Sequence, residues 1–76
     1  MSTFVVEHCE AVGEWDVKHT PSGLLAGSWQ DRKHAKTAAK ALNALCKEHE
    51  DLRSAMPGRE SLAAIKAAIK AIDAAQ

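Results

Sequence analysis

The stretch EWDVKHTPSGLLAGSWQDRKHAKTAAKAL, residues 14–42, decides the fold because its hydrophobic pattern changes period within one continuous run. In its first six residues apolar and polar side chains alternate, which places Trp15, Val17 and His19 on one face of a half-buried strand. After Asp31, a good helix N-cap, apolar residues recur at every third or fourth position, as they do along one side of a helix. The stretch therefore predicts strands that run directly into a helix.

The tetrapeptide TPSG, residues 20–23, predicts a tight turn between two strands of this stretch. Proline presets φ for the second turn position, and Gly23 accepts the left-handed conformation that closes a three-residue loop with a bulge. Such a loop fixes the register of the hairpin, in which the facing pairs are Trp15 and Trp29, Val17 and Gly27, and His19 and Leu25. We expect the two tryptophans to fill the space between the sheet and an alanine-rich helix.

The segments that flank this stretch complete the predicted fold. FVVEHC, residues 4–9, is rich in residues that favour strands, and the MPG sequence at 56–58 ends the first helix. The sequence predicts an α+β fold of one domain, residues 1–76, in which a three-stranded antiparallel meander precedes two α-helices (β-β-β-α-α). The expected elements are strands at about 3–9, 14–20 and 24–29 and helices at about 32–56 and 59–75.

The second helix carries a narrow apolar seam whose members are three, four and three residues apart, like the seam of a coiled coil. The seam residues are Leu62, Ile65, Ile69 and Ile72. A chain of 76 residues buries a small core, so the seam either packs within the chain or forms a homodimer.

Composition narrows the classes of function. The formal net charge is zero, with ten basic and ten acidic residues, which argues against a strongly nucleic-acid-binding or membrane-surface protein. No apolar run is long enough to span a membrane, and the N-terminal sequence predicts no signal peptide. We expect a cytoplasmic protein in which Cys9 and Cys46 are reduced thiols.

Neither catalysis nor metal binding is predicted. Zinc sites usually take their ligands in close pairs, and Cys46 with His49 supplies at most half of such a site. Cys9 lies beside Glu7 and Glu10, whose charges disfavour a reactive thiolate. No glycine-rich phosphate loop is present, so we expect no enzyme activity, no metal and no cofactor.

Charged side chains gather in two groups, which are the predicted partner-binding residues. The basic group lies at the start of the first helix and consists of Arg32, Lys33, Lys36 and Lys40. The acidic group lies on the first hairpin and consists of Glu7, Glu10, Glu14 and Asp16. Two such groups can steer a protein partner through complementary charge, whereas a solvated helix face is the simpler interpretation of the basic one.

The pattern FVVEH, GEWDVKH, SG and GSWQDRKHAKTAAKAL, over about residues 3–45, resembles small proteins encoded by phages and prophages. Its anchors are Trp15, Gly23, Trp29, Ala35 and Ala39. Short proteins of that origin include anti-CRISPR proteins, which are typically non-enzymatic inhibitors of a Cas complex. The resemblance implies a cytoplasmic location in a bacterial host and a host Cas complex as partner. The neutral charge balance favours steric blocking over mimicry of DNA.

The leading hypothesis is therefore a non-catalytic protein-binding module of a mobile genetic element that inhibits a bacterial defence complex. One alternative is a small nucleic-acid-binding accessory protein that uses the basic group. Another is a structural homodimer module that uses the apolar seam of the second helix.

Overall fold

Three antiparallel strands form one sheet in the order β1-β2-β3, with β2 in the middle. The computed structural model describes residues 3–75, so residues 1, 2 and 76 of the predicted domain lie outside it. Its elements are β1 (Phe4–Cys9), β2 (Glu14–His19), β3 (Leu24–Trp29), α1 (Arg32–Leu45), the 3-10 helix η1 (Glu50–Arg53) and α2 (Arg59–Ala74). The predicted class, a three-stranded antiparallel meander followed by two helices, is confirmed, and the strand boundaries agree to within one residue.

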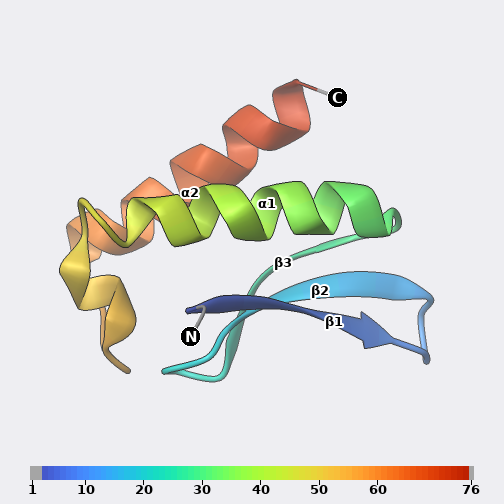
Figure 1. Ribbon diagram of the computed structural model, residues 1–76, viewed down its shortest axis with the longest axis horizontal. Helices are drawn as coiled ribbons and strands as arrows, with labels where there is room; N and C mark the ends of the chain where they lie inside the picture. Colours follow the sequence, from blue (N-terminus) through green and yellow to red (C-terminus); the bar gives the residue numbers. More distant parts are fainter. Residues whose placement is uncertain (1–2, 76) are drawn as a thin grey trace.

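Helix α1 lies on one face of the sheet, α2 packs against α1 on the same side of the sheet, and the other face is open (Figure 1). The core lies between the layers and is centred on four fully buried side chains, Phe4, Val17, Leu42 and Leu52. Buried alanines line the sheet-facing side of α1, where their small side chains leave room for the larger residues of the sheet; they are Ala35, Ala38 and Ala39.

The hairpin of β2 and β3 contains a β-bulge that shifts part of the predicted register. Trp15 pairs with Trp29 and Val17 with Gly27, as predicted, but His19 pairs with Leu24 rather than with Leu25. The loop has four residues, 20–23, and closes through a 2.8 Å hydrogen bond from the Gly23 N–H to the His19 carbonyl. Because this loop is one residue longer than predicted, Ala26 has no partner on β2 and forms the bulge.

Helix α1 ends at Leu45, eleven residues before the predicted end at about 56, and this prediction was wrong. Six-residue strands are about 20 Å long, and a helix of 14 residues is about 21 Å long, so α1 already spans the sheet. A longer helix would carry its apolar stripe past the end of the core. The chain instead turns back through η1, which buries Leu52 against the end of the core.

Helix α2 agrees with its predicted range of about 59–75 and packs along α1. Three members of the predicted seam, Ile65, Ile69 and Ile72, are half-buried against the core, whereas Leu62 is 46% exposed. The isoleucines therefore serve packing within the chain, and Leu62 stays on the surface.

The two tryptophans occupy different environments although they face each other across β2 and β3. Trp29 is buried, and its indole lies so close to Gly27 that a Cβ there would be 2.7 Å from the ring. Its Nε1–H donates a 2.9 Å hydrogen bond to Asp73, which ties the end of β3 to the end of α2. Trp15 is half-buried at the edge of the core, so only Trp29 fills the space between the layers as predicted.

Candidate functional site

An apolar groove of about 450 Å³ opens between the start of β3 and the first half of α2. Leu24 and Leu25 form its strand side, and Leu62 and Ile65 form its helix side. The segment between η1 and α2 closes one end with Met56. Helix α2 packs mainly on α1 rather than on the strands, which leaves space for the groove beside β3.

The exposed apolar side chains of the chain are concentrated at this groove. Leu24 is 68% exposed, Leu25 58% and Met56 89%, and the partly exposed Leu62 lies opposite them. Among residues 3–75, Val12 is the one other large apolar residue with comparable exposure. Scattered single apolar residues are normal on a protein surface, but a contiguous apolar patch marks an interaction site. The groove is therefore the strongest candidate binding site of the described residues.

The groove carries little charge. Of its lining residues, Lys66 is the one with a formal charge at neutral pH, and no carboxylate lines it. Its other polar side chains, Ser22 and His19, are engaged with each other. The site therefore suits an apolar ligand with at most a carboxylate at its edge.

His19 lies at the inner side of the groove, but its hydrogen bonds give it a structural role. It is 5% exposed, its Nε2 contacts the Leu52 carbonyl, and its Nδ1 lies 2.6 Å from the Ser22 hydroxyl. Because a carbonyl can only accept, Nε2 carries the proton and Nδ1 accepts from Ser22. Both ring nitrogens are occupied, so His19 joins β2 to η1 and is not free to act as a base.

A serine, a histidine and an aspartate meet where η1 approaches α2, but they do not form a catalytic triad. The Ser61 hydroxyl donates to Asp51 rather than to His49, whose Nδ1 is 3.5 Å away. Ser61 is 3% exposed, so no substrate reaches it. In a triad the histidine stands between the other two groups and accepts the serine proton. Here the carboxylate holds the serine directly.

Asp51 acts as a cap for the N-terminus of α2. Its carboxylate accepts hydrogen bonds from the Ser61 hydroxyl and, at 2.6 Å, from the Gly58 N–H. The Ser61 bond first, and the Gly58 bond second, lower the pKa of Asp51 below its ordinary value of 3.8. A negative charge at this end of a helix is also favoured by the helix dipole. The cluster thus holds η1 against the start of α2.

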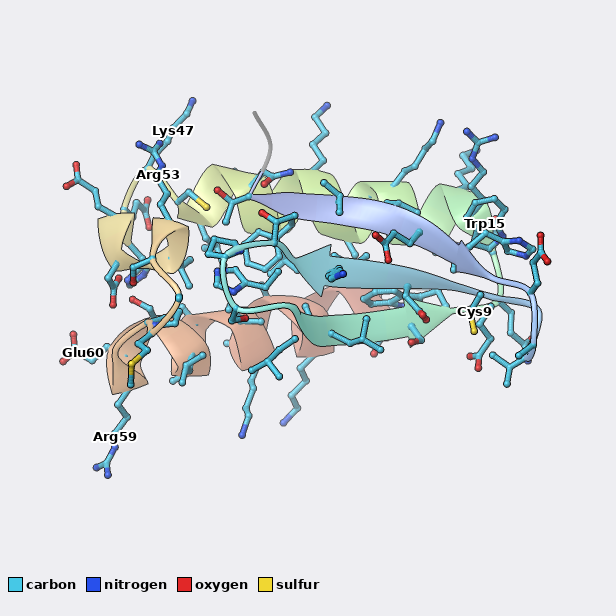
Figure 2. The ribbon with its side chains drawn as sticks, turned by 90° about the horizontal axis from the view of Figure 1, so that it is seen from below. Cys9, Trp15, Lys47, Arg53, Arg59 and Glu60 are labelled. Atoms are coloured by element: carbon cyan, nitrogen blue, oxygen red, sulfur yellow. The ribbon has the colours of Figure 1, made fainter. Side chains whose placement is uncertain are left out.

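The predicted basic group lies on the outer surface of α1, away from the groove. Arg32, Lys33, Lys36 and Lys40 are all exposed. The Arg32 guanidinium lies 5.3 Å from the centre of the Trp15 ring, and His8 stacks on that ring with 4.5 Å between centroids. Figure 2 places Trp15 at the opposite end of the molecule from Lys47 and Arg53. The basic group therefore occupies the first nine residues of α1, whereas Lys47 and Arg53 lie beyond the other end of that helix.

The predicted acidic group lies on the open face and at one end of the sheet. Glu7 and Asp16 are paired across β1 and β2, and Asp16 accepts a 2.6 Å hydrogen bond from the Ser28 hydroxyl. Glu14 begins β2, and Glu10 is exposed in the turn before it. The sheet separates these carboxylates from α1, so the acidic group and the basic group do not lie together. Neither group lies at the groove.

The residues weighed as half of a metal site have separate partners. Cys46 is buried, and its thiol donates to the Leu42 carbonyl at 3.8 Å, whereas His49 turns toward Ser61. Within residues 3–75, no group of three or more histidine, cysteine, aspartate or glutamate side chains is placed to hold a metal ion.

Leu24, Leu25 and Met56 are site residues that the sequence patterns do not identify. The helical period places Met56 on the apolar stripe of a longer α1, and the predicted hairpin register places Leu25 on the face of the two tryptophans. One feature of the sequence does indicate a binding surface here. The strand sequence LLAGSW contains no charged residue, although β3 is at an edge of the sheet, where charged residues usually protect a strand.

Comparison of the chain with protein-family models, with curated proteins and with solved structures finds no match in any of the three. In the part of the chain that the structure describes, no helix has the length and hydropathy needed to cross a membrane.

Proposed function

We propose that this chain is a non-catalytic protein-binding module that docks a partner in the groove between β3 and α2. The observation that supports the proposal is the gathering of exposed leucine and methionine side chains around one apolar groove. Interfaces place such side chains at their centre and charged side chains at their rim. The basic face of α1 and the acidic face of the sheet lie away from the groove and do not form its rim, but their charge can steer a partner toward the chain.

We further propose that the partner belongs to a bacterial defence complex, such as a Cas complex, which the chain inhibits by occupying a surface. This choice of partner rests on the resemblance of residues 3–45 to small phage-encoded proteins. Steric blocking fits a chain whose net charge is zero and whose candidate site is apolar.

The test is affinity capture from a bacterial lysate, followed by identification of the captured protein and reconstitution of the complex from purified components. Leu62→Glu introduces a charge on the helix side of the groove and should abolish the complex. Ala63→Glu is the matched control, because Ala63 is the neighbouring exposed residue of α2 and does not line the groove. The proposal predicts a stoichiometric complex with the native chain and with the control.

Three results would overturn the proposal. One is a complex that both variants form equally well, which would place the contact elsewhere. Another is capture of nucleic acid, with salt-dependent binding that is lost in Lys36→Glu with Lys40→Glu. The third is turnover of a substrate by the native chain.

A further inference from the structure

We infer that the groove takes an extended segment of the partner protein, which adds as a fourth strand along the free edge of β3. The inference rests on the proposed function and specifies the backbone conformation and side-chain chemistry of what is bound. Three features of the fold support it: the widths of the two layers, the chemistry of the β3 edge and the position of the groove.

The helix layer is wider than the sheet that it covers. Three strands are about 14 Å wide, whereas two packed helices are about 20 Å wide, so the helices exceed the sheet by about one strand. On the β3 side, Figure 2 shows the N-terminal half of α2 beside the start of β3, where Leu62 and Ile65 line the groove. The helix surface that a fourth strand would cover is therefore already present.

The edge of β3 lacks most of the features that protect an edge strand. Natural proteins protect edges with charged side chains, prolines, bulges or a covering segment. β3, with the sequence LLAGSW, contains no charge and no proline, and its bulge at Ala26 is the remaining protective feature. Among residues 3–75, β2 is the strand that pairs with β3, so the outer edge of β3 is free to bind another strand.

The groove lies where alternate side chains of an added strand would point. Every second side chain of a strand faces the helix layer. In a strand beside Leu24 and Leu25, those side chains would enter the space in front of Leu62 and Ile65. They are therefore large and apolar, and a carboxylate near the end of the segment would meet Lys66.

A second copy of this chain does not fit the β3 edge. Antiparallel pairing of two copies through β3 would place both helix layers on the same face of the joint sheet. Figure 2 shows α2 behind β3, so the α2 helices of the two copies would be brought together behind the joined strands. Packed helices need about 8–10 Å between their axes, whereas paired strands need about 5 Å. The segment that binds is thus a strand without a helix behind it.

The experiment is selection of ligands for the full chain from a displayed library of random linear peptides, with Leu25→Glu as the counter-selection variant. An enriched peptide is then synthesised with each backbone amide methylated in turn. We expect affinity to fall about tenfold or more at every second amide, because alternate amides of a strand bond to β3 while the others face away. Selection with Lys66→Glu should exchange acidic for basic residues in the enriched sequences.

A different methylation pattern would overturn strand addition. Loss of affinity at every interior amide, with side-chain contacts three or four residues apart, would show a helix in the groove. Indifference to methylation, or no enrichment over Leu25→Glu, would also reject it. The proposed function is judged separately. If Leu62→Glu abolishes binding of a captured protein, but the contact segment of that protein gives the helical methylation pattern, the partner docks in the groove without adding a strand.

Discussion

Gly27 lies against the Trp29 indole and leaves no room for a side chain of its own. A Cβ at position 27 would be 2.7 Å from the Trp29 ring, so Gly27→Ala must displace the indole and strain its bond to Asp73. We expect the variant to lose about 1–3 kcal/mol of unfolding free energy, measured from urea denaturation. In a Trp29→Leu background the same substitution should cost much less. Equal costs in the two backgrounds would contradict the contact.

His19 is the second residue on which a stability prediction depends. His19→Leu leaves the Leu52 carbonyl without its donor at the end of the core, so we expect a loss of about 1–3 kcal/mol. Ser22→Ala removes the group at the other ring nitrogen, which is only half-buried, and should cost less. Thermal or urea unfolding of both variants checks the order, and the reverse order would show that His19 is held mainly by Ser22.

Asp51 gives the folded state a defined response to acid. Its folded pKa is lowered, so its contribution to stability is present above its ordinary value of 3.8 and is lost as pH falls through the folded pKa. We expect Asp51→Asn to be less stable than the native chain at neutral pH and to lose less stability on acidification. Denaturant midpoints across this pH range check both effects, with Ser61→Ala as a second variant that lacks the main donor. Parallel pH curves for all three would contradict the cap.

At the scale of elements, the early end of α1 separates Leu52 from Met56, although both continue the apolar period of that helix in the sequence. Leu52 is fully buried, whereas Met56 is 89% exposed at the groove. Leu52→Ala should lose about 2–5 kcal/mol of unfolding free energy, and Met56→Ala should change it by less than about 0.5 kcal/mol. Similar losses in urea denaturation would indicate that the longer helix forms after all.

The elements also show which part of the fold follows from the sequence. Alternation in EWDVKH and the glycine of TPSG predict the meander, and the spacing of Ile65, Ile69 and Ile72 predicts a helix face that packs. The end of α1 does not follow, because Leu52 and Met56 continue the helical period. The end of α1 is determined by the length of the sheet, a tertiary property, because helical residues beyond the sheet would have no core to pack against.

At the scale of the whole molecule, the sequence indicates the charged surfaces but not the groove. The basic group is exposed, whereas the acidic group includes the half-buried Glu14 and Asp16, and the two groups lie on opposite sides of the sheet and meet no common site. The groove depends on how α2 is placed against β3, which no local pattern encodes. Its residues look like core in the sequence because Leu24, Leu25 and Leu62 are chemically equivalent to buried leucines.

Docking of a partner in the groove is tested by nuclear magnetic resonance mapping of the captured partner on the labelled chain. Docking in the groove predicts that the backbone amide resonances that shift or broaden belong to β3, to the segment around Met56 and to the first half of α2. The resonances of the exposed face of α1 and of the acidic pair Glu7 and Asp16 should change little. Shifts confined to the α1 face or to the open sheet face would contradict the central claim.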